Sequence, residues 1–305
     1  MSAISTCELT RVFGHGQGVH GLNLQVPEGA VYGFLGPNGA GKTTTIRLLL
    51  GLLRPDAGEV RLFGSALTHS DRRALGTVGA MVENPSLYPH LSAYDNLEVT
   101  RRLIDAPVAR IDEVLKLVNL DDPVSRRKRV RELSLGMRQR LGIALALLGS
   151  PRLLILDEPS NGLDPAGIVE MRRFILRMTR ELGVTVFLSS HLLTEVEQLA
   201  SHVGVIHEGH LLFEGTLEEL RSRSGETLEI ACGDGKAAYA CLREAGEAPE
   251  LVDANTLHLD HPRQPDHVIN RLLVEHGHAV SRLVRHRQSL DTLFFELTGE
   301  REKAA

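Results

Sequence analysis

The pattern of apolar and polar positions predicts an α/β core. Apolar runs at residues 31–35, 153–157 and 184–188 are almost uninterrupted, which is typical of strands buried on both faces of a parallel sheet. Over residues 165–182, between the last two runs, apolar side chains recur every three or four positions and predict a helix. A strand, a helix and a second strand in this order form a βαβ crossover.

Further segments complete the first domain. Residues 7–35 contain short strands and residues 58–64 form another strand bounded by glycines, so we expect a mixed sheet. From Ala93 to about Leu148 the apolar spacing becomes helical. We therefore predict a helical subdomain at about residues 88–150, inserted into a domain that spans residues 1–222.

The last part of the chain predicts a small α+β accessory domain at residues 226–305. A capping box at residues 216–219 predicts the start of a short helix, and residues 222–226 resemble a linker. The later elements are expected as strand 227–231, helix 236–245, strand 251–259, helix 266–276, strand 279–285 and helix 289–298.

Composition narrows the class of protein. The 305 residues can bury a full core, and a formal net charge of −5 gives no general attraction to nucleic acid or anionic lipid. The three cysteines have no paired or metal-type spacing, which favours a reducing cytosol. Apolar stretches such as residues 141–148 are far shorter than the roughly 20 residues that cross a bilayer. Residues 1–5 also lack the features of a signal peptide. We expect a soluble cytoplasmic chain that reaches the inner face of the membrane only through a partner.

Residues 36–43 match the phosphate-binding loop G-x-x-x-x-G-K-[ST], between a predicted strand and a predicted helix. Backbone N–H groups of such a loop and the positive end of the helix dipole bind phosphate. Lys42 would neutralise phosphate oxygens, and the Thr43 hydroxyl would hold Mg²⁺. The predicted triphosphate-binding residues are Gly36, Pro37, Asn38, Gly39, Ala40, Gly41, Lys42, Thr43 and Thr44.

Two carboxylates, Asp157 and Glu158, follow the apolar strand at residues 153–157. Ligands bind at the carboxyl end of strands in an open α/β sheet. We predict that Asp157 contacts Mg²⁺ and that Glu158 is the catalytic base that polarises the attacking water. The alternative is that both are ordinary acids at a helix start, because Pro159 follows them.

The segment at residues 133–141 resembles the signature segment of ABC-type ATPases, a likeness that covers residues 1 to about 220. Ser134 and Gly136 match the Leu-Ser-Gly-Gly-Gln consensus, whereas Leu135 and Met137 depart from it. The resemblance implies a P-loop NTPase core and a homodimer in which Ser134 and Gly136 contact the ATP of the opposite copy. A Ser at a helix N-terminus suits an anion, although a plain helix cap is the alternative.

Three more positions take a role from this resemblance. Asp164, within residues 161–164, resembles the loop that crosses the dimer interface. His191 resembles the histidine that senses the γ-phosphate and orders Glu158. Phe13 lies where the family places an aromatic that stacks on adenine, and core packing is its alternative role.

Glu83 stands where the family usually has a glutamine that binds Mg²⁺ and the attacking water. A carboxylate oxygen is a suitable ligand for Mg²⁺, whereas the alternative is an exposed loop acid. Together with residues 133–137, Glu83 resembles the branch of bacitracin and lantibiotic self-protection exporters. That branch implies a separate transmembrane permease of the ABC-2 type.

We therefore predict the ATP-binding and ATP-hydrolysing subunit of an ABC-type exporter, with ATP and Mg²⁺ as ligands. The cargo class is open between drug, peptide antibiotic and lipid. The alternatives are an ABC-type ATPase acting on ribosomes or DNA, and a P-loop kinase. The basic run at residues 126–131 is flanked by acids and has no interleaved aromatics, so we expect no nucleic-acid partner. Histidines gather in the accessory domain without metal-ligand spacing.

Overall fold

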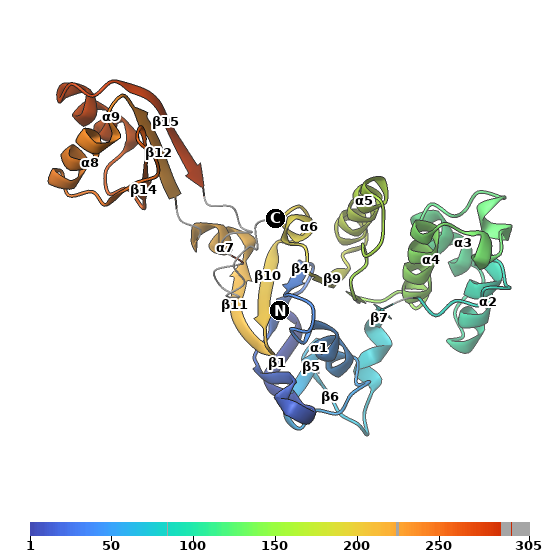
Figure 1. Cartoon of the computed structure of the whole chain (residues 1–305). Coiled ribbons are helices and arrows are strands. Elements are labelled where there is room, and N and C mark those ends of the chain that lie inside the picture. The colour runs from blue at the N-terminus through green and yellow to red at the C-terminus, as the bar shows by residue number, and fades with distance from the viewer. Residues whose placement is uncertain (84, 224–225, 288–293, 295–305) are drawn as a thin grey trace. The chain divides into compact units, whose positions relative to one another are not determined.

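The computed structural model describes residues 1–83, 85–223, 226–287 and 294. The chain divides into two compact units, Met1–Leu217 and Glu218–Ala305, so the division lies near the predicted boundary at residue 222. Figure 1 shows the elements of both units. The first unit contains two sheets and a helical subdomain, and the second contains one sheet.

The large sheet of the first unit has six strands in the order β11-β10-β4-β9-β8-β7. β4, β9, β8, β7 and β10 run parallel to their neighbours, and β11 is antiparallel to β10. Every residue of β4, β8 and β9 is buried, which confirms the interpretation of the apolar runs. The strands are β4 (Val31–Leu35), β7 (Val78–Met81), β8 (Leu153–Leu156), β9 (Thr185–Ser190), β10 (His202–His207) and β11 (His210–Thr216).

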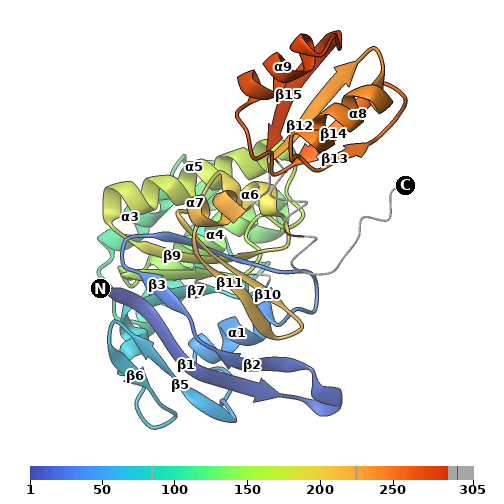
Figure 2. The ribbon, with the colours of Figure 1, turned by 90° about the vertical axis from the view of Figure 1, so that its left-hand side faces the viewer.

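The second sheet is antiparallel and also belongs to the first unit. Its central strand β1 pairs with β2, β3 and β5, and β6 pairs with β5. Helix α1 (Lys42–Leu49) lies between the two sheets in Figure 2, and its buried Ile46 belongs to a core shared with both sheets. The strands are β1 (Ser2–Val12), β2 (Gly18–Leu22), β3 (Gln25–Pro27), β5 (Ala57–Leu62) and β6 (Ser65–Leu67).

The predicted helical subdomain is formed by α2 (Ala93–Leu103), α3 (Ala109–Leu117) and α4 (Leu135–Leu147). It lies beside β7 and α5 in Figure 1. Helix α5 (Pro165–Leu182) has the predicted bounds because its capping residues are local: Asp164 caps the start, and Gly183 at φ 65° ends it. It connects parallel neighbours β8 and β9, which confirms the βαβ crossover. Two short helices follow, α6 (Leu193–Glu197) and α7 (Leu217–Arg223).

The second unit contains a four-stranded antiparallel sheet in the order β13-β14-β12-β15. Residues of α8 and α9 share its apolar core with β12 and β14. The elements are β12 (Glu226–Cys232), α8 (Gly235–Glu244), β13 (Pro249–Leu251), β14 (Thr256–Asp260), α9 (Asp266–Glu275) and β15 (Val280–Arg287). This βαββαβ order is that of a ferredoxin-like unit.

One element of the second unit differs from its prediction. The single strand expected at residues 251–259 is two strands, β13 and β14. Asp253 Oδ1 accepts the N–H groups of Asn255 and Thr256, each at 2.8 Å, and so makes a side-chain-stabilised turn. The helix predicted at residues 289–298 lies outside the described residues except for Phe294.

Phe187 on β9 is central to the buried core of the first unit. It is fully buried, and its ring lies 5.4 Å from the rings of both Tyr32 and Phe34. We expect Phe187→Ala to lower the free energy of unfolding by about 3–5 kcal/mol, because the cavity adds to the lost burial. Leu182→Ala, at a half-exposed helix end, is the control and should cost less than about 1 kcal/mol. Denaturant unfolding of both variants checks this, and equal losses would contradict it.

Candidate functional site: a nucleotide-binding pocket

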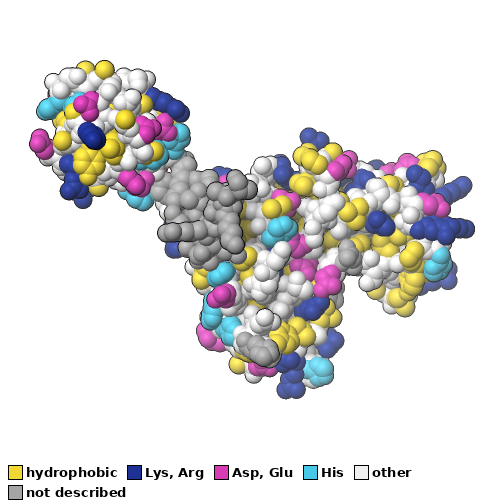
Figure 3. All heavy atoms as spheres, viewed as in Figure 1, with side chains coloured by type: hydrophobic (Ala, Val, Ile, Leu, Met, Phe, Trp, Pro, Cys, Tyr) yellow, Lys and Arg dark blue, Asp and Glu magenta, His cyan; other side chains and the backbone are white. Residues whose placement is uncertain are grey.

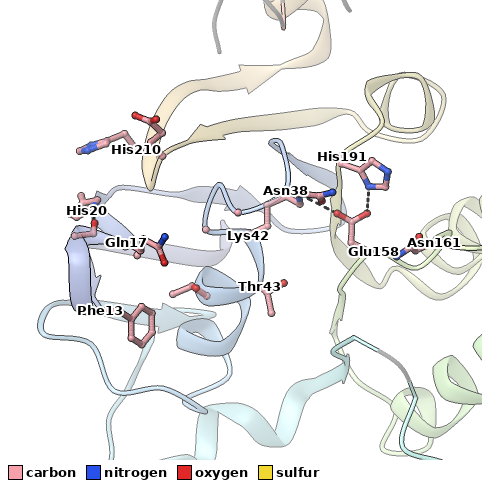
Figure 4. Close-up of a pocket in the computed structure, with 16 residues that line it drawn as sticks. Phe13, Gln17, His20, Asn38, Lys42, Thr43, Glu158, Asn161, His191 and His210 are labelled. Atoms are coloured by element: carbon pink, nitrogen blue, oxygen red, sulfur yellow. Dashed lines mark hydrogen bonds and ion pairs between the residues drawn. The ribbon is translucent and has the colours of Figure 1, made fainter. Parts of the chain in front are cut away.

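Three neighbouring parallel strands end at one edge of the large sheet and deliver the predicted residues there. β4 leads into the phosphate loop at Gly36, β8 leads to Asp157 and Glu158, and β9 leads to His191. The carboxyl ends of parallel strands form the ligand-binding edge of an open α/β sheet. Residues that are far apart in the sequence therefore meet, as Figure 4 shows for Lys42, Glu158 and His191.

A pocket opens at this edge. It is lined by most of the predicted phosphate-loop residues, including Lys42. The predicted adenine-stacking residue Phe13 and the predicted catalytic residues Glu158 and His191 also line it. The lining residues are Phe13, Gly16, Gln17, Gly18, His20, Asn38, Gly39, Gly41, Lys42, Thr43, Thr44, Glu158, Asn161, His191, Glu208 and His210. Gly36, Pro37, Ala40 and Asp157 do not line the pocket.

The phosphate loop depends on glycine at two positions. Gly41 has φ 108°, a conformation that a side chain strains, directly before α1 begins. A Cβ atom on Gly36 would lie 2.4 Å from the Ile206 carbonyl oxygen. Inside the loop, Lys42 Nζ donates to the carbonyl oxygens of Gly36 at 2.7 Å and Pro37 at 3.2 Å. Lys42 is only 6% exposed, so its cation is held ready at the centre of the loop.

Thr43 and Asp157 meet below the loop. The Thr43 hydroxyl donates to Asp157 Oδ2 at 2.9 Å, and Asp157 Oδ1 accepts a hydrogen bond from Ser189 Oγ at 2.6 Å. Asp157 is 2% exposed, and these two hydrogen bonds hold its carboxylate in place. A hydroxyl and a carboxylate are hard oxygen donors, and the pair fits Mg²⁺.

Glu158 lies between a cation and an imidazole. Its Oε1 is 3.2 Å from Lys42 Nζ, and its Oε2 is 2.8 Å from His191 Nδ1. The Glu158 backbone has φ 48° and its N–H donates to Ser189 Oγ at 2.9 Å. A non-glycine residue in this region is strained, and such strain gathers at functional sites. The arrangement aims the Glu158 carboxylate into the pocket.

Four more predicted residues lie outside this pocket. Glu83 forms an ion pair with Arg47 on α1, and its side chain is 59% exposed. Ser134 Oγ accepts the N–H of Met137 at 3.2 Å, and Asp164 Oδ1 accepts that of Gly167 at 2.9 Å. Within one chain these two residues therefore act as helix caps.

The fourth, Gly136, lies on the first turn of α4, where an added Cβ would meet only Leu163 at 3.7 Å. The contacts of Glu83, Ser134, Gly136 and Asp164 with nucleotide stay predictions.

Several pocket residues escaped the sequence analysis. The rings of His20 and His210 stack with centroids 4.9 Å apart, and both line the pocket. The turn between β10 and β11 joins them to the phosphate loop, because Gly209 N donates to Ala40 O and Gly209 O accepts from His20 N, each at 2.9 Å. His20 and His210 are far apart in sequence, so no local pattern indicates that they meet. The glycines after Phe13 were the only local signal of a ligand-binding segment there.

The basic run at residues 126–131 lies between α3 and α4 in the helical subdomain, whose surface carries both basic and acidic side chains in Figure 3. Arg126 pairs with Asp112 at 2.9 Å and lies 4.9 Å over the ring of Tyr94. Within the described residues, no group of three His, Cys, Asp or Glu is placed to hold a metal ion. No helix in that part of the chain is long and apolar enough to cross a bilayer.

A phosphate loop, a buried aspartate beside its threonine and an inserted helical subdomain define a P-loop ATPase of the ABC class. The family model "ABC transporter" matches residues 19–161. The chain is 42% identical over 299 residues to the bacitracin transport ATP-binding protein BcrA of Bacillus licheniformis, and the match covers 97% of each chain. It is 43% identical over 206 residues to the lantibiotic transport ATP-binding protein SrtF of Streptococcus pyogenes, covering 68% of this chain and 87% of that protein.

A solved structure of cbiO1 from Clostridium perfringens, part of the ABC transporter complex cbiONQ, has a similar fold. Its TM-score is 0.66 at 27% identity, and the match covers 73% of this chain and 91% of that chain. This chain belongs to the ABC transporter family, as an ATP-binding subunit that hydrolyses ATP to drive transport. The predicted fold class, family and ATPase activity are confirmed. Membership implies dimerisation and a membrane-spanning permease as partner, and it does not favour action on ribosomes or DNA.

Proposed function

We propose that two copies of this chain bind two ATP·Mg²⁺ between them and drive an exporter whose ABC-2 type permease is a separate chain. The observation that carries this proposal is the meeting of Lys42, Asp157 and Glu158 at one sheet edge. The similarity to a bacitracin transport subunit over 97% of both chains supports the exporter. The chain would then lie on the cytoplasmic face of the membrane, and its cargo would be a peptide antibiotic, another drug or a lipid.

Phosphate binding is assigned to the loop and to Lys42. The N–H groups at the start of α1 and the Lys42 cation face the pocket and would hold the triphosphate oxygens. Phe13, which also lines the pocket, offers a ring face for adenine. Because Lys42 Nζ now contacts Glu158 and two loop carbonyls, bound phosphate would replace part of this contact set.

Hydrolysis is assigned to the residues around Glu158. Thr43 and Asp157 would hold Mg²⁺, and Glu83 would join them only after release from Arg47. Mg²⁺ would neutralise charge that develops on the phosphate oxygens. Glu158 Oε2 would orient the attacking water, while His191 keeps that carboxylate in position through its 2.8 Å contact. Lys42 stabilises the negative charge of the transition state.

A shared site explains the residues that lie outside the pocket. Ser134 and Gly136 begin α4 and leave N–H groups free for an anion at its N-terminus. Neither residue lines the pocket of its own chain, so a contact with nucleotide would come from the second copy. Asp164 at the start of α5 would lie at the same interface.

Mixing two inactive variants tests the shared site. Lys42→Ala and Ser134→Arg each damage both sites of a homodimer, but a mixed dimer keeps one site with both residues intact. Equal amounts should therefore recover about a quarter of wild-type ATPase activity, because half of the dimers are mixed and each has one intact site. A phosphate-release assay measures this.

An equal mixture of Lys42→Ala and Asn38→Ala is the control. Both residues belong to the phosphate loop, so each site of a mixed dimer contains one damaged loop and no site is intact. Recovery in that mixture, or none in the first, would contradict the proposal.

Co-purification tests the partner. The Glu158→Gln variant, held with ATP, should recover a multi-span membrane protein from cells that express its natural neighbours. Recovery of ribosomes or DNA instead would support the rival class. The wild-type chain without nucleotide is the control for unspecific capture.

A further inference from the structure

The turn that follows β9 connects the phosphate loop with the catalytic carboxylate. Ser190 is the last residue of β9 and pairs with Leu35, directly before the loop. Its carbonyl oxygen accepts the N–H of Gly36 at 3.4 Å. The next residue, His191, contacts Glu158 Oε2 at 2.8 Å. The orientation of this short turn therefore affects both the loop and the catalytic residue.

The side chain of Ser190 organises the turn. Its hydroxyl oxygen accepts the N–H of Leu192 at 3.0 Å, and the hydroxyl lies 3.3 Å from both the Leu192 carbonyl oxygen and Glu195 Oε2. Ser190 is 2% exposed, so water cannot substitute freely for these partners. Glu195 is the one charged side chain in hydrogen-bond contact with Ser190 among the described residues.

Glu195 is a half-buried acid that the chemistry described so far does not use. Burial raises the pKa of its carboxyl group above the ordinary value, the charges of His191 and Arg172 oppose that rise, and the nearby charge of Glu158 adds to it. An acid in the first turn of a helix interacts favourably with the positive end of the helix dipole, and this is the simplest explanation for Glu195. That explanation does not require the carboxylate to be partly buried against the catalytic turn.

Arg172 joins a second helix to the α6 segment. It lies on α5, which Asp164 caps, and one of its terminal nitrogens bonds to Gln198 just after α6. Its Nε is buried and has no hydrogen-bond partner in the described part of the chain. The guanidinium is thus directed at the residue that follows α6, and its positive charge opposes the rise in the pKa of Glu195 that burial causes.

We propose that Glu195 is a positioning residue for ATP hydrolysis, which holds the Ser190–His191 turn in the geometry that directs Glu158 at water. The proposal rests on the assignment of Glu158 as catalytic base. Glu195 does not line the nucleotide pocket. It acts through the Ser190 hydroxyl and through its charge, which lies near His191 and Glu158.

Two substitutions separate the hydrogen bond from the charge. Glu195→Gln keeps an oxygen that accepts from Ser190 but removes the charge, whereas Glu195→Ala removes both. We expect Glu195→Ala to lower kcat about 10-fold with less than about a 2-fold change in KM, because misplacement of a catalytic group affects the chemical step more than binding. Glu195→Gln should recover part of that loss.

The split between kcat and KM, and its partial recovery in Glu195→Gln, are the readouts that a merely structural role would not give. A general loss of folded protein would change binding and turnover together, whereas a misplaced catalytic carboxylate lowers kcat and leaves KM nearly unchanged.

The experiment uses the full chain, together with its permease if the chain alone is inactive. Glu197→Gln is the matched control, because it changes the same group on the same helix two positions along. An unchanged kcat in both Glu195 variants would overturn the proposal, as would losses that only follow a lower melting temperature. If Glu158→Gln also leaves turnover unchanged, the assigned catalytic base has failed rather than Glu195.

Discussion

Glu158→Gln is expected to lower the turnover of ATP about 10³-fold while nucleotide stays bound. The amide has the shape of the carboxylate but cannot accept a proton, and a positioned general base contributes about 10²–10⁴-fold. Glu158 is held at 3.2 Å from Lys42 and 2.8 Å from His191, so the variant keeps its place in the pocket. ATP should then accumulate in a closed dimer, visible by size-exclusion chromatography.

The same variant should bind ADP more tightly than the wild-type chain. In the present geometry Glu158 attracts the Lys42 cation, and phosphate competes for that cation. The amide that replaces the carboxylate carries no charge, so Lys42 would be released at a smaller cost. ADP cannot be hydrolysed here, so calorimetric titration with ADP separates this effect from slow turnover. Glu181→Gln on the exposed surface of α5 is the control.

The turnover measurement decides the role of Glu158 as base. Unchanged ATP turnover in pure Glu158→Gln protein would show that Glu158 is not the base.

Lys42→Ala is expected to lower kcat/KM for ATP at least about 10³-fold. Lys42 is the cation that lines the pocket beside the phosphate loop, and it is 6% exposed. Loss of a single preorganised donor at a developing negative charge costs about 10²–10³-fold, and loss of ground-state phosphate binding adds to this. Stopped-flow binding of a fluorescent ATP analogue and phosphate release measure the two parts.

Two further variants make the Lys42 result specific. Lys116→Ala removes an exposed cation from α3 and should leave turnover unchanged. Lys42→Arg keeps the charge but brings a planar group that does not fit the Gly36 and Pro37 carbonyls, so it should restore little activity. Full activity of Lys42→Ala, with its fold intact by circular dichroism, would contradict the assignment of the phosphate site.

Local sequence was sufficient for the features whose cause lies within a few residues. The phosphate loop needs Gly36 and Gly41 beside Lys42, and all three are neighbours in sequence. Helix α5 was predicted with correct bounds because Asp164 and Gly183 cap it directly. The wholly buried strands β4, β8 and β9 were predicted for the same reason, because each contains consecutive apolar residues that indicate burial on both faces.

The local apolar pattern gave the wrong element where the hydrogen bonds of a single side chain turn the backbone. Asp253 turns the chain between β13 and β14, whereas the apolar spacing there favoured one strand. The ion pair of Glu83 with Arg47 on α1 was likewise not visible in the local pattern, and the contact of Glu83 with Mg²⁺ stays a prediction.

The residue types for triphosphate chemistry are therefore present in the sequence as motifs, and the resemblance of those motifs to a family named the class of enzyme. Only the tertiary structure placed Glu158 between Lys42 and His191, stacked His20 on His210, and set Glu195 beneath Ser190. The physical reason is that strand order and helix packing join segments that are distant along the chain. Backbone periodicity records which face is buried, but it does not record which buried faces meet.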